Sequence, residues 1–235
     1  MIICSWKFPK AISYIADVKK FGMTEFTFRV ALTKDEEEVL KFIREFYYPE
    51  ELLTLSIAPK EPTKADEEFS LSCIPTGLSI VAENSSGDFV GVLLCHEVDN
   101  STLPERKIQT SQITDCKWRA ILTFLHDLEE HSAICRRLDV PKGVQFSVLS
   151  VHSGHRGKSI GQKLMQKASE NALEKGFGAI GAVCTSIFSA RIAEKLGMTL
   201  VHTQAYRDWQ GEVELRPPAP HENATANCYV KKLVK

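Results

Sequence analysis

A basic, glycine-containing turn separates a strand-like segment from a helix-like segment in the last third of the sequence. It extends from Val151 to Gly161 and reads VHSGHRGKSIG. The N–H groups at the start of a helix have no partner within the helix, and the helix dipole places partial positive charge there. Gly157 and Gly161 have no side chains to hold a ligand away, and Arg156 and Lys158 add positive charge. The turn is therefore predicted to bind a diphosphate.

Other phosphate-binding motifs fit this turn less well. A nucleotide P-loop that ends in Gly157-Lys158-Ser159 needs a glycine at position 152, where this chain has His152. A dinucleotide-binding fingerprint needs G-x-G-x-x-G in an early βαβ unit, whereas this turn comes late and has another spacing. From the residues alone, a plain basic helix cap without a ligand remains open.

The hydrophobic pattern predicts strands and helices that alternate along most of the chain. The predicted strands are residues 24–32, 77–83, 89–95, 144–151, 178–184, 198–206 and 225–234. The predicted helices are residues 116–137, 157–174 and 186–196, and one that begins at the N-cap Thr33, with Glu36 completing a capping box, and ends near Tyr48. Residues 50–76 are predicted to be irregular to helical.

This order predicts an α/β fold with a central mixed, twisted sheet and helices on both sides. We expect one domain over residues 1–235, with residues 1–22 as an N-terminal arm. The chain is long enough for a sizeable core, and 43% of its 235 residues are hydrophobic.

The charge and the cysteines exclude several classes of protein. The net charge of −1 gives no overall attraction to nucleic acid or to an anionic membrane. No segment approaches the ~18 apolar residues of a membrane-spanning helix. The 7 cysteines are scattered and include no C-x-x-C pair, so neither a disulfide framework nor a zinc site is predicted. We expect a cytoplasmic monomer without a metal.

The stretch from Leu149 to Leu164 resembles the acetyl-CoA motif of the GNAT superfamily of N-acetyltransferases, Arg/Gln-x-x-Gly-x-Gly/Ala. Arg156 takes the first place of the motif and Gly161 the last, while Ser159 stands where the family usually has its middle glycine. The resemblance implies the GNAT fold and acetyl-CoA as co-substrate. The residues that it implies for binding acetyl-CoA are Leu149, Ser150, Val151, Arg156, Gly157, Lys158, Ser159, Ile160 and Gly161.

Three further blocks resemble the invertebrate arylalkylamine (dopamine-type) N-acetyltransferases. Residues 46–52 are similar to their Phe-x-x-Asp-Glu-Pro-Leu segment, and residues 183–197 to their Cys-Ser-Ser-x-x-Ser-Ala-Arg…Glu-Lys-Leu-Gly stretch. Residues 211–221 are similar to a run near their C-terminus. The resemblance implies acetylation of a primary arylalkylamine of the dopamine, serotonin, tyramine and octopamine class.

The same resemblance implies roles for single residues. Glu50 is implied as the general base that takes the proton of the amine, with Glu51 as the fallback in this register. Thr185 and Ser189 are implied as hydroxyls that take part in the release of the CoA thiolate or bind substrate. The substrate-binding residues that it implies are Phe46, Tyr47, Glu50, Leu53 and His221.

Other residues are weaker candidates for the chemistry. Cys184 could act as a nucleophile, but no pattern places a histidine beside it, so direct transfer is predicted. Tyr206 and His202 are alternative proton donors. A backbone N–H near Val151 is expected to polarise the thioester carbonyl.

Two other functions remain open. The acceptor could be agmatine or a polyamine, which the acidic residues 50–51 and 66–68 would favour, and the acyl group could be longer than acetyl. Alternatively, the chain could be a non-catalytic acyl-CoA-binding module that acts through protein contacts.

Overall fold

One seven-stranded sheet, in the order β1-β2-β3-β4-β5-β7-β6, carries all the other elements. The structure is a computed structural model that describes residues 25–99, 101–222 and 224–234. The predicted N-terminal arm, residues 1–22, lies outside the described residues. The strands are β1 (Phe26–Val30), β2 (Ile80–Asn84), β3 (Phe89–Asp99), β4 (Lys142–Val151), β5 (Ala179–Cys184), β6 (Thr199–Ala205) and β7 (Thr225–Lys232). Within this sheet β4 and β5 pair in parallel and the other neighbours are antiparallel, which confirms the predicted mixed sheet.

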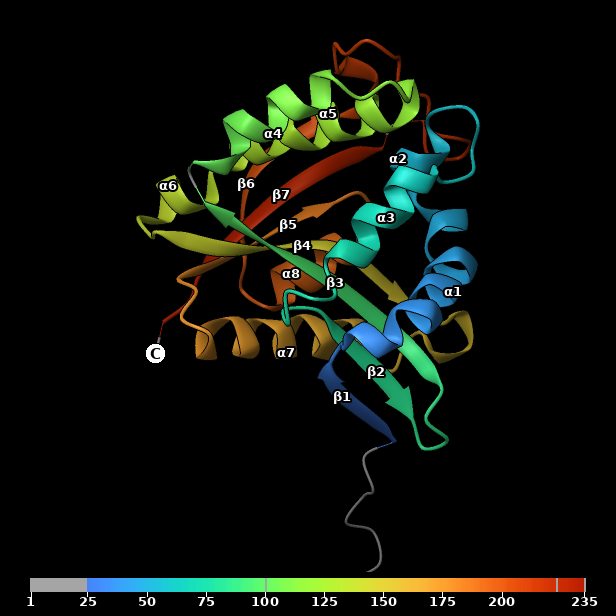
Figure 1. Cartoon of the computed structure of the whole chain (residues 1–235), viewed down its shortest axis with the longest axis vertical. Helices are drawn as coiled ribbons and strands as arrows, with labels where there is room; N and C mark the ends of the chain where they lie inside the picture. The colour runs from blue at the N-terminus through green and yellow to red at the C-terminus, as the bar shows by residue number, and fades with distance from the viewer. Residues whose placement is uncertain (1–24, 100, 223, 235) are drawn as a thin grey trace, which may run out of the picture.

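Helices cover both faces of the sheet (Figure 1). The α-helices are α1 (Glu36–Phe46), α2 (Leu52–Leu55), α3 (Lys64–Ser72), α4 (Thr102–Ser111), α5 (Cys116–Ser132), α6 (Ile134–Leu138), α7 (Ile160–Glu174) and α8 (Ile187–Lys195). The 3₁₀ helices are η1 (Thr33–Asp35), η2 (Tyr48–Glu50), η3 (Ser153–His155) and η4 (Tyr206–Asp208).

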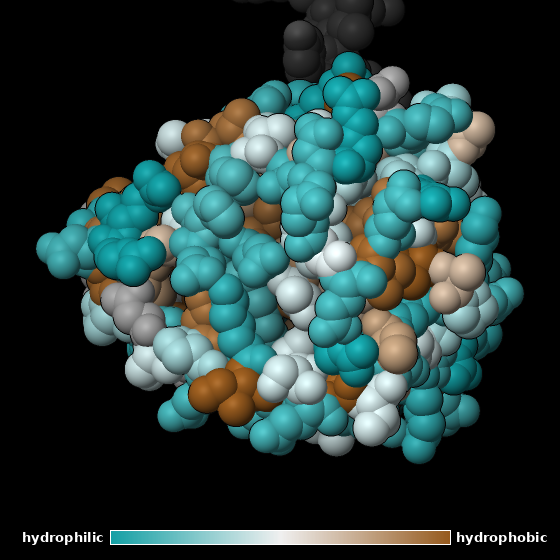
Figure 2. Space-filling model, turned by 90° about the horizontal axis from the view of Figure 1, so that it is seen from above, coloured by the Kyte–Doolittle hydropathy of each residue, from teal (hydrophilic) through white to brown (hydrophobic). Residues whose placement is uncertain are grey.

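The two faces of the sheet bury different residues of the same strands. Successive side chains of a strand point to opposite faces. On β2 and β3, Ile80 and Leu93 therefore join the core beneath α7 and α8, whereas Val81 and Val92 join the core beneath α1. Helices α2 and α5 cover β5 and β7 with a third apolar cluster. The outer surface over α4 and α5 is mainly hydrophilic, with scattered apolar groups (Figure 2).

Helix α1 begins later than predicted. Thr33 lies in η1, and the N-cap of α1 is Asp35, so the capping box predicted from Thr33 and Glu36 is wrong. The Asp35 carboxylate accepts a hydrogen bond from the Leu32 N–H (2.8 Å) and pairs with Arg29 (2.6 Å). Because Arg29 holds this carboxylate at the end of β1, the chain makes a tight turn there before α1 can begin.

The helix predicted over residues 116–137 is two helices. Helix α5 ends at Ser132, Ala133 has a left-handed backbone (φ 42°), and α6 follows. Helix α4 was not predicted, because it has no buried apolar residue among its described side chains. It is attached to α5 by ion pairs instead, between Arg106 and Glu129 (2.7 Å) and between Lys107 and Glu130.

Helix α7 lies against β3 at Gly91. A Cβ atom at this position would be 2.9 Å from Ile160 Cγ2 and 3.0 Å from Leu164 Cδ1. We predict that Gly91→Ala destabilises the protein by about 1–3 kcal/mol, since α7 cannot keep its place against a side chain there. Thermal unfolding should show a lower midpoint, by about 2–4 °C per kcal/mol for a chain of this length.

The double variant Gly91→Ala/Ile160→Ala checks the cause of that loss. Ile160→Ala removes the methyl group that the new Cβ meets, so the double variant should lose less stability than the sum of the two single variants. Strict additivity would contradict a clash between these two residues.

Candidate functional site

The parallel pairing of β4 and β5 stops before the two strands end. The last paired residues are Phe146 and Ala182, yet β4 continues to Val151 and β5 to Cys184. The pairing of β3 with β4 skips Ser147, so β4 carries a bulge at the level where it leaves β5. The end of β4 is therefore bonded to β3 on one side, while its other side has no pairing to β5 and borders an opening.

The predicted diphosphate-binding turn begins where β4 ends. The chain passes through η3 and a turn in which Gly157 and Ser159 have left-handed backbones (φ 80° and 61°) before α7 begins at Ile160. The first N–H groups of this 15-residue helix have no carbonyl partners within the helix. They make the start of α7 suitable for an anion.

The two cations of the turn are paired with carboxylates. Arg156 lies 2.9 Å from Glu50, and Lys158 lies 2.5 Å from Glu25. All four side chains are more than 40% exposed, and ion pairs this open contribute only about 0–1 kcal/mol. A diphosphate can therefore replace these carboxylates at little cost, so the residues present fit the phosphate groups of acetyl-CoA.

Gly161 was predicted to leave room for a ligand, but its missing side chain leaves room for α8. A Cβ atom at this position would lie 3.0 Å from Ile192 Cδ1 of α8 and 3.6 Å from Val151 Cγ2. Its missing side chain lets α8 pack against α7. Gly157, in contrast, would meet nothing within 4 Å, so its requirement is the left-handed backbone.

The other residues predicted to bind acetyl-CoA surround the same start of α7. Leu149 and Val151 pack against the core that contains the buried Ile160. Ser150 is buried, and its hydroxyl donates to the carbonyl of Phe46 at the end of α1 (2.9 Å). The structure thus brings the predicted residues together between α1, α7 and the end of β4.

A cavity of about 280 Å³ lies next to this opening, walled by α2, α3, α4, α5 and the strands β3, β4 and β5. Its lining falls into three groups. Acids and hydroxyls lie at Tyr47, Glu51, Thr54, Asp66, Ser70 and Thr185; apolar walls include Leu53, Phe69, Trp118, Ile121, Leu122 and Leu125; a second polar group contains His96, Arg106, Thr110, His126, Glu129 and Ser147. The combination of apolar walls and a few polar groups is typical of a small-molecule site.

Two neighbouring glutamates have opposite environments. Glu51 is 8% exposed and lines the cavity, where its carboxylate accepts hydrogen bonds from the Thr54 N–H (2.6 Å) and the Thr185 hydroxyl (3.0 Å). The Glu50 side chain is 57% exposed, pairs with Arg156 and is not among the residues that line the cavity. Because η2 ends between them, the chain turns one carboxylate inward and the other outward.

Asp66 is a second carboxylate in the cavity. Its partner is the Tyr48 hydroxyl, 3.2 Å away. Burial, followed by repulsion from Glu51, raises the pKa of Asp66 to about 7. Lys117 lies nearby, but its ammonium group donates to the backbone carbonyls of Thr54 (3.0 Å), Pro59 and Glu61 (2.8 Å). Among the described residues, Asp66 therefore makes no ion pair, and Lys117 acts on it only at longer range.

The structure separates the two predicted hydroxyls, Thr185 and Ser189. Thr185 precedes α8, lines the cavity and bonds to Glu51. Ser186 is the N-cap of α8, and the Ser189 hydroxyl donates to its carbonyl (3.0 Å). Ser189 is not among the residues that line the cavity.

The alternative reactive residues do not face the cavity. Burial raises the pKa of the Cys184 thiol to about 12, so the thiol is protonated at neutral pH and is a poor nucleophile. Tyr206 is fully buried and packs against Phe124 (5.3 Å between ring centroids). His202 stacks on His131 (4.3 Å).

Of the residues predicted to bind the acceptor, Tyr47 and Leu53 line the cavity. Phe46 instead packs against His152, with ring centroids 4.4 Å apart. His221 is exposed and does not line the cavity.

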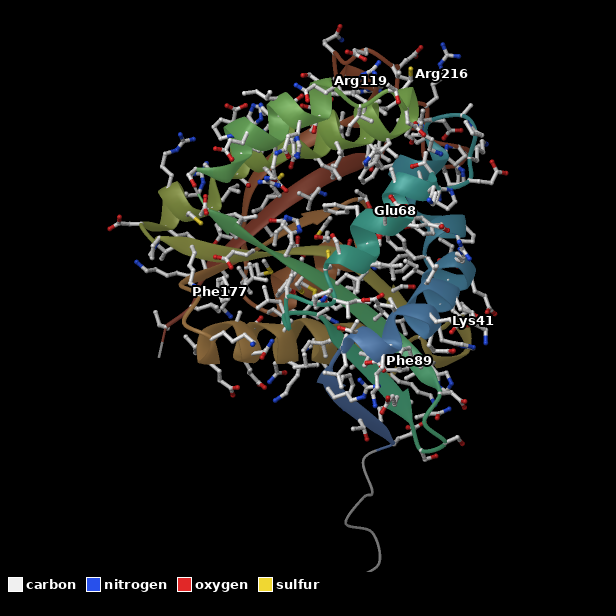
Figure 3. All side chains as sticks on the ribbon, viewed as in Figure 1. Lys41, Glu68, Phe89, Arg119, Phe177 and Arg216 are labelled. Atoms are coloured by element: carbon white, nitrogen blue, oxygen red, sulfur yellow. The ribbon has the colours of Figure 1, made fainter. Side chains whose placement is uncertain are left out.

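The C-terminal segment that contains His221 is fixed to the α2 and α5 end of the molecule. Its Glu212 pairs with Arg119 on α5 (2.9 Å), and the Arg216 N–H donates to the carbonyl of Ser56 (3.0 Å). Figure 3 shows Arg119 and Arg216 at this same end. The residue of the segment that is buried against α2 and α5 is Leu215.

Sequence reasoning missed most of the cavity. Trp118 and its neighbours on α5 were predicted only as part of a helix over residues 116–137, and Asp66 only as one acid of a run. Nothing in the sequence connects His96, Arg106 and Glu129, because they come from three different elements.

Metal-binding groups and membrane-spanning helices are both absent from the described residues. In residues 25–99, 101–222 and 224–234, no three His, Cys, Asp or Glu side chains are grouped so that they could hold a metal ion. The same part of the chain has no helix with the length and apolar character needed to cross a bilayer.

Ser159 adopts a backbone that glycine adopts more readily. A left-handed conformation costs an L-residue about 1–2 kcal/mol, and a glycine at this position would avoid that cost. Part of this stabilisation is offset because glycine loses more conformational freedom when the chain folds. We predict that Ser159→Gly raises the free energy of unfolding by about 0.5–1 kcal/mol without weakening acetyl-CoA binding. Chemical denaturation and isothermal titration measure the two effects.

Gly157→Ala is the matched control for this prediction, since it adds a side chain two residues earlier at φ 80° where no neighbouring atom is in the way. It should lower the free energy of unfolding by a similar amount. A Ser159→Gly variant that is less stable than the parent protein would refute the argument from backbone strain.

Comparisons with known proteins agree with this geometry. The mosquito arylalkylamine N-acetyltransferase like 5b has 33% sequence identity to this chain and a TM-score of 0.83; the match covers 88% of this chain and 100% of the mosquito chain. The Drosophila melanogaster polyamine N-acetyltransferase, an enzyme that catalyses the formation of N-acetylagmatine, has 30% identity, the same coverages and a TM-score of 0.83. An agmatine N-acetyltransferase has 29% identity and a TM-score of 0.83, over 89% of this chain and 100% of its own.

The family comparison covers most of the sheet and the predicted diphosphate-binding turn. The model of the acetyltransferase (GNAT) family matches residues 40–198. This span includes β2 to β5, the opening between β4 and β5, and helices α7 and α8. Since the match extends over more than half of the sequence, the chain belongs to the acetyltransferase (GNAT) family, as its resemblance to that family implied.

Proposed function

We propose that this acetyltransferase transfers the acetyl group of acetyl-CoA directly to the primary amine of an arylalkylamine, with Glu51 as the general base. The observation that carries the proposal is the buried Glu51 carboxylate, which lines the cavity beside Thr185. The start of α7 supports acetyl-CoA as the donor. Phe69, Trp118 and the leucines of α5 suit an aryl ring, because aromatic rings pack well against such side chains.

Glu51 can take the proton that blocks the amine. An alkylamine has a pKa near 10 and is protonated at neutral pH, so it must lose a proton before its nitrogen can attack. Glu51 is held in one orientation by the Thr54 N–H and the Thr185 hydroxyl, which leaves its remaining lone pairs for the ammonium group. Acetyl-CoA supplies the acetyl group as a thioester. Backbone N–H groups of β4 near Val151 are the proposed donors to the thioester oxygen.

This proposal reverses the order of the two glutamates. The resemblance implied Glu50 as the base and kept Glu51 as the fallback. Burial and the contacts with the cavity favour Glu51, whereas the ion pair of Glu50 with Arg156 suits a role beside the phosphate-binding turn. The proposed roles of Ser189 and His221 keep only the support of the resemblance.

We predict that Glu51→Gln lowers kcat/KM by about 10²–10⁴-fold, because glutamine cannot accept the proton of the amine. The measurement is thiol release from acetyl-CoA with tyramine, dopamine and serotonin. Retained binding of acetyl-CoA and an unchanged circular dichroism spectrum would show that the variant is folded.

The neighbouring variant Glu50→Gln is the matched control. It should keep kcat within about threefold, because proton transfer is worth far more than an exposed ion pair. A larger loss for Glu50→Gln than for Glu51→Gln would return the base to Glu50. Bound acetyl-CoA without thiol release for any amine would favour a non-catalytic acyl-CoA-binding module, and release only with longer donors would change the acyl group.

Agmatine or a polyamine is the second candidate acceptor. The buried carboxylate of Asp66 in the cavity favours such an acceptor. A second buried carboxylate without a cationic partner could hold a second positive charge of the acceptor. The structures of two of the relatives concern enzymes that act on agmatine or polyamines. On this candidate, Asp66→Asn should weaken agmatine binding much more than phenethylamine binding, whereas the arylalkylamine candidate predicts similar losses for both.

Asp66 also predicts how acceptor binding depends on pH. Its pKa of about 7 means that it is neutral below that pH and attracts an ammonium group above it. Glu51 and Tyr48 lie beside it, and Lys117 is held by backbone carbonyls. We predict that the Kd for tyramine rises about tenfold from pH 8 to pH 6, and that this rise disappears in Asp66→Asn. Titrations without acetyl-CoA measure it, and an unchanged slope in the variant would contradict the role of Asp66.

A further inference from the structure

Lys117, near the start of α5, is a lysine buried beside the cavity. It is 5% exposed and directly precedes Trp118, which lines the cavity. Its ammonium group donates to the backbone carbonyls of Thr54 (3.0 Å), Pro59 and Glu61 (2.8 Å). A lysine ammonium has three N–H groups, so these carbonyls occupy all of them. Lys117 thus joins α5 to the turn that follows α2 and brings a full positive charge into the interior.

Carboxylates compensate the charge of this ammonium group from a distance. Carbonyl oxygens satisfy its N–H groups, but a buried charge also requires opposite charge nearby. Burial lowers the pKa of Lys117, and four carboxylates oppose this effect. They belong to Asp66, Glu61, Glu51 and Asp115. Of the four, Glu51 and Asp66 are buried, so water screens their attraction to Lys117 least.

The two cavity carboxylates depend on Lys117 in return. Burial disfavours the ionised form of Asp66, and so do the charges of Glu51 and Glu67. The Tyr48 hydroxyl and the Lys117 ammonium group favour it. Lys117 is therefore a cation that helps two neighbouring carboxylates to be ionised together.

Tyrosine hydroxyls complete the surroundings of Glu51. Burial raises the pKa of Tyr47 and of Tyr206 well above the ordinary value for a tyrosine, so both side chains are uncharged at neutral pH. These tyrosines therefore leave the balance of charge to the carboxylates and Lys117.

The three bonds to backbone carbonyls decide how Lys117 acts. A cation in contact with a carboxylate occupies oxygen lone pairs, which an incoming ammonium group could then no longer use. Lys117 is held by the backbone instead, so its charge acts on Glu51 and Asp66 while their remaining lone pairs stay available. The same three bonds fix the turn after α2, and the N-cap of α2 is Glu51, the proposed base.

From this arrangement we propose that Lys117 is a positioning residue for the acetyl transfer, whose ammonium group favours the ionised forms of Glu51 and Asp66 without occupying their oxygen atoms. This inference rests on the proposed function, because it assigns the residue that prepares the base of the same cavity. Lys117 does not touch the acceptor and acts through the two carboxylates.

The first test follows the Asp66 carboxyl group by ¹³C NMR in protein labelled at aspartate, without substrates. The signal is assigned by its loss in Asp66→Asn, and in the parent protein it should titrate at about pH 7. Lys117→Met removes the cation that favours ionisation, so the midpoint should rise by about 0.5–1 pH unit. Lys117→Arg keeps the positive charge and should leave the midpoint close to that of the parent protein.

The second test is the pH profile of kcat/KM with tyramine. Lys117→Met should lower kcat/KM by about 3–10-fold at pH 6 and by less than about twofold at pH 9, because the carboxylates of both proteins are ionised at high pH. A residue that only holds the turn in place would lower kcat/KM by the same factor at every pH. If thermal unfolding shows that Lys117→Met does not fold, Lys117→Gln removes the charge and keeps two N–H groups for the carbonyls.

Lys60→Met is the matched control. Lys60 lies between Pro59 and Glu61 in the same turn, but its side chain is exposed. Water and salt screen its charge, so the variant should keep both the Asp66 midpoint and the pH profile of the parent protein.

The outcomes distinguish this inference from the function on which it rests. An unchanged Asp66 midpoint in folded Lys117→Met, or a loss of kcat/KM that is the same at every pH, would overturn the role of Lys117 and leave the acetyltransferase proposal standing. A parent protein that acetylates no amine, although its Asp66 midpoint responds to Lys117→Met, would instead overturn the proposed function.

Discussion

The early end of the pairing between β4 and β5 is the constraint on which the rest of the site depends. Beyond Phe146 and Ala182 the two parallel strands share no pairing, so one strand can lead into the predicted diphosphate-binding turn while the other leads to Thr185. Pairing with β3 keeps β4 in the sheet as far as Val151, while the backbone groups on its other side face the opening. The turn that carries Glu50 and Glu51 then meets both strands from across the opening, through Arg156 and Thr185.

Much of the fold could be predicted because its signals are local. Alternating apolar residues mark the strands, and the basic turn with its following helix marks the site at α7. These local signals do not predict elements whose start or presence depends on tertiary contacts. Asp35 replaces Thr33 at the start of α1 because Arg29 holds it, and α4 lacks an apolar stripe because ion pairs with α5 hold it in place.

The site divides in the same way. Tyr47 and Leu53 were expected to bind the acceptor, and Thr185 to take part in thiolate release or bind substrate; all three line the cavity. The choice between Glu50 and Glu51 could not be made from their types, because one step along a 3₁₀ turn decides which carboxylate is buried. His96, Arg106 and Glu129 meet only through the packing of β3, α4 and α5, and no motif or spacing relates them.

The bulge at Ser147 changes which residues of β4 face each side of the sheet. Before it, Val144 and Phe146 point toward α7; after it, Leu149 and Val151 do, so the inward positions change from even to odd numbers. Val148 accordingly packs against α1. A single extra residue thus lets the first half of β4 border the cavity and its second half lead into the predicted diphosphate-binding turn. Removing that residue would turn the side chains of one half to the opposite face of the sheet.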